Sequence, residues 1–383
     1  MPKMRRKEND PMWQDELKQN ITSAEELRTL LPMEEQEYED IRRIADSFPM
    51  SISRHYFGLI NPDDPDDPIR KLCIPSSSEF NREGVLDTSG EADNTKVSGL
   101  QHKYGPTVLA LSTNKCGTYC RFCFRRRFVG TSEDEVIRRM DHLAEYVKSH
   151  PEADNVLVSG GDSFMNSNAS IRHLLELLSE IDSLRFIRFA TRMITFLPNR
   201  INQDQEFLDI LAEYNQKKQI IVIAHFEHPN ELTEESYTAA GKIQSIGIPI
   251  RNQTVLLRGV NDNPETMSDL MNGLVSWGIM PYYVFQCRPV TSVKKQFQVP
   301  FIEGYRIIDE AKKTMSGPAK QFRFAMSHVT GKIEIIGMLD EKHMIFKYHQ
   351  AKDLRDNGRI MVIDVSDQKA WLSQEETRTG RIG

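Results

Sequence analysis

The stretch KCGTYCRFCFRRRFVG, residues 115–130, contains Cys116, Cys120 and Cys123 in a C-x3-C-x2-C spacing. Three thiols within eight residues predict a loop wrapped around a cluster of thiolate-bound irons. Such a cluster usually takes four ligands, and three cysteines leave one iron open to a small molecule. The alternative is three unpaired thiols or a disulfide. Because three of the chain's five cysteines fall within eight residues, metal binding in a reducing compartment is favoured.

Composition narrows the class of protein. The chain has 383 residues, with 39% hydrophobic and 27% charged residues and a net charge of −6. This length can bury a sizeable core, and the negative charge argues against nucleic acid as the main partner. The N-terminal sequence MPKMRRKENDPMW has no apolar core, and no stretch approaches the roughly 20 apolar residues of a membrane span. We therefore expect a cytoplasmic protein that does not contact a membrane.

A repeated pattern of apolar runs and amphipathic stretches begins at Thr107. Each run has four to ten residues, and several are rich in β-branched side chains, which is typical of strands buried on both faces. In 133–148, apolar residues at spacings of three and four predict a helix. Six strand–helix units predict a parallel sheet with right-handed crossovers, an α/β fold that forms a partial, open (β/α)6 barrel. The six runs are 107–112, 155–160, 185–190, 219–224, 248–257 and 282–287.

The regions before and after the barrel have other patterns. Residues 1–100 are predicted to form a helical N-terminal region, with helical periodicity in 13–31 and 34–48, and 101–318 to form the barrel. The NPDDPDDP segment in this first region is predicted to be a surface turn, because its prolines disrupt the spacing of a calcium loop. Residues 319–383 should form a C-terminal segment. It contains a β-hairpin, KIEIIGM and HMIFKYH around LDEK, and ends in a loosely attached polar tail of about 30 residues.

Polar residues cluster where predicted strands end. The second strand ends in SGGD, which is Ser159, Gly160, Gly161 and Asp162; two glycines allow a ligand to approach the backbone closely. Arg192, His225 and Gln253 follow later strands. Buried groups of these types need polar partners, which a ligand or internal packing could supply. His225 and His228 could also form a metal pair, but no third ligand is near in sequence. In such barrels, chemistry gathers at these strand ends.

The cysteine spacing resembles that of the radical S-adenosylmethionine (SAM) superfamily, and the extended run CRFCFRRRF is similar to the lysine 2,3-aminomutase family. The similarity extends from Trp13 to about residue 350. It includes HKY at 102–104, SGGD, VLLRGVND at 255–262 and HFEHPNE, where the family reads THFNHPNE.

The resemblance implies a [4Fe-4S] cluster on the three cysteines that cleaves SAM and generates a 5′-deoxyadenosyl radical. It also implies that SGGD contacts the amino group of SAM, and that Arg192, His225 and Gln253 surround its carboxylate and ribose. Arg125, the first residue of the triple arginine Arg125–Arg127, would hold the substrate carboxylate; the alternative for this run is a solvated or nucleic-acid-binding patch. The expected partners are a small amino-acid-like substrate, an electron donor such as flavodoxin or ferredoxin, and a second copy of the chain.

Two departures from the family concern pyridoxal phosphate (PLP). Without gaps, Lys332 in AMSHVTGKIEII aligns with the family's PLP lysine; aligned on the hairpin, most of the glycine-rich segment is deleted and Lys332 is an ordinary strand residue. A family arginine near the PLP phosphate is replaced by Thr107. Both changes weaken phosphate binding. The sequence does not decide whether PLP is bound, but these changes argue against PLP binding.

Two further departures concern the substrate side chain and a zinc site. The lysine enzymes hold the distal ammonium with two aspartates, which match Arg288 and Ala325 here. A cation would be repelled by Arg288. The family's zinc-binding C-terminal cysteines are absent, and their interface partner is replaced by Asn263.

The predicted function is a radical SAM enzyme, a 2,3-aminomutase-type isomerase that is not specific for lysine and acts on an amino acid with an anionic or neutral side chain. One alternative is a PLP-independent radical SAM epimerase or dehydrogenase. Another is an iron–sulfur protein without catalytic activity, although a structural cluster would have no need of SGGD, Arg192 and Gln253.

Overall fold

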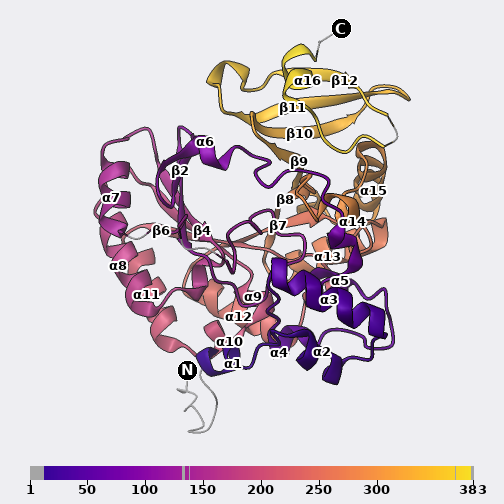
Figure 1. The fold of residues 1–383 in the computed structure, drawn as a ribbon. Helices are drawn as coiled ribbons and strands as arrows, with labels where there is room; N and C mark the ends of the chain where they lie inside the picture. The colour runs from indigo at the N-terminus through magenta and orange to yellow at the C-terminus, as the bar shows by residue number, and fades with distance from the viewer. Residues whose placement is uncertain (1–12, 132–133, 138, 367, 381–383) are drawn as a thin grey trace.

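The computed structural model describes residues 13–131, 134–137, 139–366 and 368–380. Its centre is one sheet of 12 strands that follow one another in chain order and do not close into a barrel. Seven neighbouring strands, β3 to β9, are parallel, and antiparallel strands extend the sheet at both ends. Figure 1 shows the helices outside this curved sheet.

The six predicted parallel strands are confirmed. Their side chains are largely buried because helices cover one face and the barrel interior lies on the other. The seventh parallel strand, β9 (Arg323–His328), was not predicted as a strand. The six are β3 (Thr107–Thr113), β4 (Asn155–Gly160), β5 (Phe186–Thr191), β6 (Gln219–Ala224), β7 (Ile250–Leu256) and β8 (Met280–Gln286).

The connecting helices bury one apolar face each. In α8, Leu174 and Leu178 are buried, and Ser167 caps the first turn by accepting the Ser170 N–H. The helix predicted over 133–148 is shorter than expected: α7 begins only at Met140. Residues 133 and 138 of the predicted range lie outside the described part of the chain. The outer helices are α7 (Met140–Lys148), α8 (Asn168–Ser179), α11 (Gln205–Asn215), α12 (Glu234–Ser245), α13 (Pro264–Ser276) and α15 (Phe301–Thr314).

Shorter helical segments complete the connections. They are η2 (Ser163–Met165), α9 (Met193–Phe196), α10 (Asn199–Asn202), η3 (Pro229–Glu231), α14 (Lys294–Phe297) and η4 (Pro318–Lys320).

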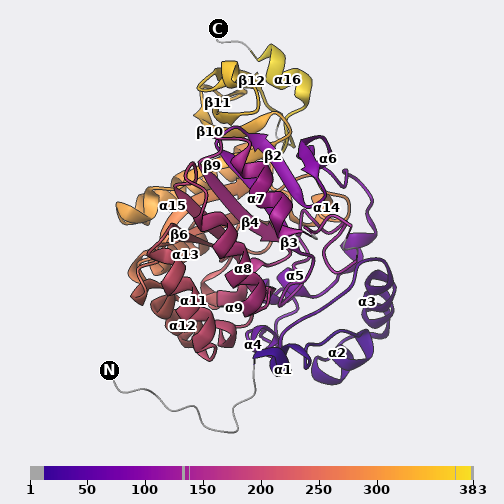
Figure 2. The ribbon, with the colours of Figure 1, turned by 90° about the vertical axis from the view of Figure 1, so that its left-hand side faces the viewer.

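The N-terminal region packs beside the loop that follows β3 (Figures 1 and 2). Its apolar residues form a core shared with Phe122 of the cysteine loop and Phe297 of α14. The segment predicted as helical over 13–31 is two helices, and the proline-rich 61–67 segment forms turns before α5. The elements are α1 (Trp13–Leu17), α2 (Ala24–Leu30), α3 (Glu35–Ser47), α4 (Arg54–Phe57), α5 (Pro68–Cys73), η1 (Ser77–Phe80), α6 (Glu91–Asn94), β1 (Thr95–Val97) and β2 (Leu100–Tyr104).

The C-terminal strands close off one side of the barrel. The predicted hairpin is confirmed as β10 (Gly331–Met338) and β11 (His343–Ala351). The prediction of a loosely attached polar tail was wrong. The chain continues through η5 (Leu354–Asp356) into β12 (Ile360–Asp364), which pairs with β11, and α16 (Gln374–Thr379). The polar composition concealed a few apolar residues, such as Met361 and Leu372, which are almost fully buried.

Within the described residues, no helix combines the length and apolar content needed to cross a membrane.

The burial of β12 can be tested with two neighbouring residues. Met361 is fully buried, whereas Ile360 is 42% exposed. Met361→Ala should lower the free energy of unfolding by about 2–5 kcal/mol because it leaves a cavity, and Ile360→Ala should lower it far less. Thermal unfolding of both variants measures the difference. Equal, small shifts would show that β12 is loosely attached after all.

Candidate active site at the mouth of the open barrel

A cavity of about 890 Å³ extends through the interior of the open barrel, from the carboxyl ends of the parallel strands to residues at their starts, such as Thr107 and Asn155. It is lined by all the residues that the sequence proposed for a site, although they are spread over more than 200 positions of the chain. They are Cys116, Cys120, Cys123, Arg125, Ser159, Gly160, Gly161, Asp162, Arg192, His225, Gln253, Arg288 and Lys332.

The cysteine loop follows β3 directly and is fastened by the N-terminal region. Asn20 donates its side-chain amide to the Gly117 carbonyl at 2.7 Å, and the Tyr119 N–H donates to the Ser51 carbonyl at 2.8 Å. The Arg121 N–H donates to the Leu72 carbonyl at 2.9 Å. The helices that precede the barrel therefore define the path of the loop.

The three cysteines are free, partly buried and face the same cavity. Burial raises the pKa of each thiol, and the Arg192 guanidinium opposes this effect at Cys120. A buried set of three soft sulfur donors, with one end open to a cavity, fits an iron–sulfur cluster that has one iron available.

Glu79 neutralises two arginines of the cysteine loop. Its carboxylate accepts two hydrogen bonds from Arg121, at 2.8 and 2.7 Å, and one from Arg126 at 2.6 Å. All three side chains are almost fully buried. Arg126 is therefore a structural residue, and the reading of the triple arginine as a solvated patch is wrong.

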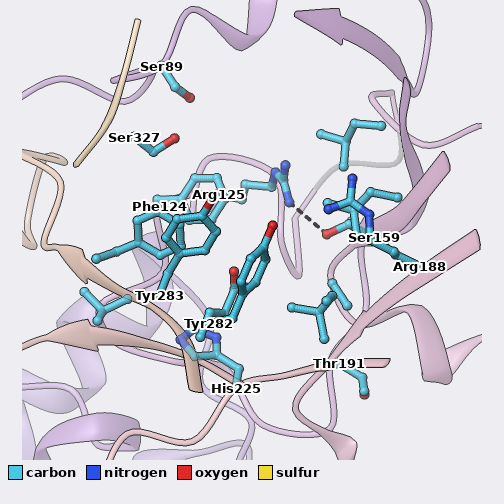
Figure 3. A pocket seen from close by; sticks show the side chains of 18 of the residues that line it. Ser89, Phe124, Arg125, Ser159, Arg188, Thr191, His225, Tyr282, Tyr283 and Ser327 are labelled. Atoms are coloured by element: carbon cyan, nitrogen blue, oxygen red, sulfur yellow. Dashed lines mark hydrogen bonds between the residues drawn. The ribbon is translucent and has the colours of Figure 1, made fainter. Parts of the chain in front are cut away.

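Glu91, in the first turn of α6, neutralises the other two arginines of the run. Arg125 Nε donates to Glu91 at 2.9 Å, and Arg127 Nη1 donates to it at 2.6 Å. Arg125 Nη1 also donates to the Ser159 hydroxyl at 3.1 Å, as Figure 3 shows. Arg125 alone of the three lines the cavity.

The SGGD segment is pressed against the cysteine loop. A Cβ atom on Gly160 would lie 2.3 Å from the Thr113 carbonyl oxygen, and one on Gly161 would lie 2.3 Å from that of Lys115. Gly160 also has a φ of +123°, which disfavours other residues. The glycines thus permit contact between two backbones, in addition to any approach by a ligand.

Asp162 joins the ends of β4 and β5. It accepts hydrogen bonds from the Thr191 hydroxyl at 2.7 Å, the Arg192 N–H at 2.6 Å and the Phe164 N–H at 3.0 Å. Both carboxylate oxygens are therefore engaged. Burial raises the pKa of Asp162, and these hydrogen bonds oppose the rise.

Arg192 connects the cysteine loop to β6. Its guanidinium donates to Cys120 Sγ at 3.0 Å, to the His225 carbonyl at 3.0 Å and to Glu231 at 2.5 Å. Glu231 also accepts the Tyr56 hydroxyl of α4 at 2.6 Å. This network fixes Arg192 beside the cysteines and holds its charge at the cavity wall.

His225 lies against a second buried carboxyl group. Its Nε2 is 2.5 Å from Glu227 Oε1, and neither atom has an aligned hydrogen bond to another described residue. Burial raises the pKa of Glu227 well above its usual range and, together with Arg192, lowers that of His225 to about 3. Both shifts favour the uncharged forms of the two groups. Gln253, on β7, lines the same wall.

Lys332 is a strand residue whose ammonium group lies inside the cavity. It sits in β10, and its Nζ lies 5.7 Å from the centre of the Tyr104 ring and 5.1 Å from that of Tyr283. Burial, together with the nearby charges of Arg188 and Arg288, lowers the pKa of Lys332 to about 7. The lysine is thus a nucleophilic amine near neutral pH.

The far wall of the cavity carries two more cations. Arg288 stacks 3.9 Å from the centre of the Phe124 ring and donates to the Ser89 hydroxyl at 2.8 Å. Lys103 donates to the backbone carbonyls of Ser89 and His328. Burial lowers the pKa of Lys103 to about 7 and that of Arg288 to about 10.

The charge balance of the cavity is strongly positive. Among the described residues that line it, seven are lysine or arginine and two are acidic. The two carboxylates, Glu91 and Asp162, are already engaged with arginines and N–H groups. An anionic ligand would therefore find uncompensated positive charge here.

Several residues of the site have no obvious sequence signal. Glu79 and Glu91 lie among ordinary surface-like residues, and Glu231 reads as part of a helix start. Arg188 follows an apolar residue inside a strand. The alternation of RFIRFA could have shown that Arg188 faces away from Ile187 and Phe189, which are buried in the core.

The role of Glu79 can be tested by substitution. Glu79→Gln leaves Arg121 and Arg126 buried without an anion, which should cost about 3–5 kcal/mol of stability and reduce the iron content after reconstitution. Glu83→Gln is the control, since the Glu83 pair with Lys294 is mostly exposed. Thermal unfolding and iron assays measure both effects. Equal behaviour of the two variants would show that the cysteine loop does not depend on Glu79.

Comparisons with known proteins agree with the geometry. Residues 111–271 match the Radical SAM superfamily. The chain is 38% identical to a candidate L-lysine 2,3-aminomutase of Aquifex aeolicus (strain VF5), over 91% of this chain and 93% of that protein. It is 36% identical to the L-lysine 2,3-aminomutase of Clostridium subterminale, over 81% and 73%. It is also 32% identical to the glutamate 2,3-aminomutase of Clostridioides difficile (strain 630), over 81% and 72%. The chain is a divergent member of the lysine 2,3-aminomutase family of radical SAM enzymes.

Proposed function

We propose that this enzyme moves an amino group between neighbouring carbons of an α-amino acid other than lysine, in a cavity that also holds a [4Fe-4S] cluster, SAM and PLP. The observation that carries the proposal is that one cavity brings together three cysteines, Arg125 and the amine of Lys332.

Cys116, Cys120 and Cys123 would hold the cluster, and the walls beside them would hold SAM. When bound, the cluster and SAM would supply the radical chemistry that removes a hydrogen atom from the substrate. The protein's own contribution is positioning. Arg192 offers positive charge beside the cysteines, while Ser159, His225 and Gln253 supply polar groups. A reduced flavodoxin or ferredoxin would be the electron donor.

Arg125 is placed to bind the substrate carboxylate. Its Nε and Nη1 are engaged with Glu91 and Ser159, and its Nη2 makes no hydrogen bond to a described residue. The guanidinium is held rigidly in the cavity wall, so little conformational entropy would be lost when it binds a carboxylate.

Arg288 and Lys103 favour a substrate whose side chain is anionic or neutral. Both cations contact Ser89, and no acidic residue pairs directly with either among the described residues. Moving a substrate ammonium group next to them would be unfavourable in this partly desolvated space.

Lys332 is the residue that would link PLP covalently. Its half-buried position between aromatic rings fits this role better than the sequence suggested, because a solvated strand lysine was the alternative. When bound, PLP supplies the aldehyde carbon that carries the migrating amino group. The low pKa of Lys332 keeps its amine available for that link.

The first prediction concerns the cluster. Anaerobically reconstituted protein should hold about four irons and release 5′-deoxyadenosine from SAM under reducing conditions. Cys120→Ala should lose both properties. Cys73→Ala should keep them, because Cys73 is buried in the neighbouring apolar core and does not line the cavity. A full cluster in Cys120→Ala would overturn the assignment.

The second prediction concerns substrate charge. L-Lysine should be turned over at least about tenfold more slowly than an amino acid of similar length with an anionic or neutral side chain, because Arg288 repels the distal ammonium. Arg288→Ala should narrow this ratio. The measurement is kcat/KM for each amino acid with both proteins. A preference for lysine in the unsubstituted enzyme would refute this reading of the far wall.

The third prediction concerns Lys332. Borohydride reduction of PLP-treated protein should leave a pyridoxyl group on the Lys332 peptide, detected by mass mapping. The extent of labelling should rise with pH around 7, because only the neutral amine reacts and the pKa of Lys332 is about 7. Exposed Lys96 provides the comparison for non-specific labelling within the same digest. Deoxyadenosine formation without a Lys332 adduct would favour a PLP-independent epimerase or dehydrogenase.

A further inference from the structure

Arg188 presents an unused hydrogen-bond donor to the cavity. Its Nη2 donates to the Asn155 side chain at 2.5 Å and lies 3.4 Å from the Thr107 hydroxyl, both neutral partners. Its Nε is buried and has no partner among the described residues. No carboxylate of the described chain forms an ion pair with it. The guanidinium is therefore a fixed, largely desolvated cation whose hydrogen bonds are incomplete.

Tyr104 offers a second unused donor beside it. Its hydroxyl is buried without a described partner, and Tyr104 is the strand partner of Thr107 in the β2–β3 pair. Thr107 in turn contacts Arg188, so the two donors belong to one corner of the cavity. Lys332 Nζ lies over the ring of the same tyrosine.

Buried donors without acceptors are unfavourable, and they are rare in native proteins unless a ligand supplies the acceptor. Here the missing acceptor should be anionic, because it must also neutralise Arg188. A phosphate group meets both requirements, since it offers several oxygens and pairs well with guanidinium groups. Its source could be a cofactor joined to Lys332 or free phosphate.

We propose that Arg188 and Tyr104 form the subsite for the phosphate group of PLP linked to Lys332. This proposal rests on the proposed function. It also explains how the chain could bind a phosphate although Thr107 stands where the related enzymes carry an arginine. The Thr107 hydroxyl and Asn155 hold Arg188 in position, and Arg188 provides the positive charge.

The experiment compares PLP with pyridoxal, which has the aldehyde but no phosphate. Cluster-loaded protein is treated with each compound at the same concentrations and reduced with borohydride, and the adduct at Lys332 is quantified by mass mapping. The unsubstituted protein should be labelled at least about tenfold more effectively by PLP. In Arg188→Gln the preference for PLP should fall to near one. Labelling by pyridoxal should persist, shifted to higher pH because loss of the Arg188 charge raises the pKa of Lys332, and this labelling shows that the fold and Lys332 are intact.

Two further variants sharpen the result. Tyr104→Phe removes only the hydroxyl and should reduce the PLP preference in part. Arg251→Gln is the matched control, because Arg251 also lines the cavity but is exposed; it should keep the full preference. Inorganic phosphate should compete with PLP in the unsubstituted protein and not in Arg188→Gln.

Each contrary result has a distinct meaning. Equal labelling of Lys332 by PLP and pyridoxal, or a preference that survives in Arg188→Gln, would overturn the subsite. Absence of labelling by either compound would refute the PLP assignment itself. In that case the Tm is measured with and without inorganic phosphate. A rise in Tm that Arg188→Gln abolishes would identify a subsite for free phosphate. No rise in Tm would refute the phosphate subsite.

Discussion

The pairing of two buried carboxylates with four arginines determines the shape of the cysteine loop. Glu79 binds Arg121 and Arg126, and Glu91 binds Arg125 and Arg127. Buried charges are tolerated only when they are paired and hydrogen-bonded, so these contacts leave the loop few alternative conformations. Both carboxylates come from the segment that precedes the barrel. The N-terminal region is therefore part of the active site's construction, although it contributes few groups to the cavity itself.

The cavity divides into regions of different chemical character. The cysteines, the glycine pair and Arg192 lie where the parallel strands end, as expected from the general behaviour of such barrels. Lys332 and Arg288 lie on the opposite side, towards the C-terminal sheet. Arg125, held between Glu91 and Ser159, lies between them. Under the proposed function, a ligand that chelates iron would lie at one end of the cavity, and an anionic ligand held by lysine and arginine would lie at the other.

Local sequence patterns were enough to predict much of the fold and of the residues around the cavity. Apolar runs identified six parallel strands, and the polar residues at their ends all reached one cavity, because the carboxyl ends of parallel strands meet at one edge. The sequence failed where tertiary contacts decide. A polar tail became a strand and a helix, since a few buried residues such as Met361 outweigh average composition. The burial of Arg126 depends on Glu79, 47 positions earlier, which the sequence did not identify as its partner. Nothing in the sequence around Glu79 or Arg126 indicates that these two side chains form a pair.

The C-terminal sheet brings Lys332 into the cavity from outside the (β/α) repeat. Strand β10 pairs antiparallel with β9, the last of the parallel strands, and with β11, so it extends the same sheet that carries the cysteine loop and the glycine pair. The cysteine loop and the proposed PLP lysine thus come from the parallel and the antiparallel part of one sheet. Under the proposed function, changes to β10 and β11 would alter the surroundings of Lys332 and leave the cysteine loop unchanged. For enzyme engineering, the antiparallel strands offer positions around Lys332 that can be changed independently of Arg125 and Arg288.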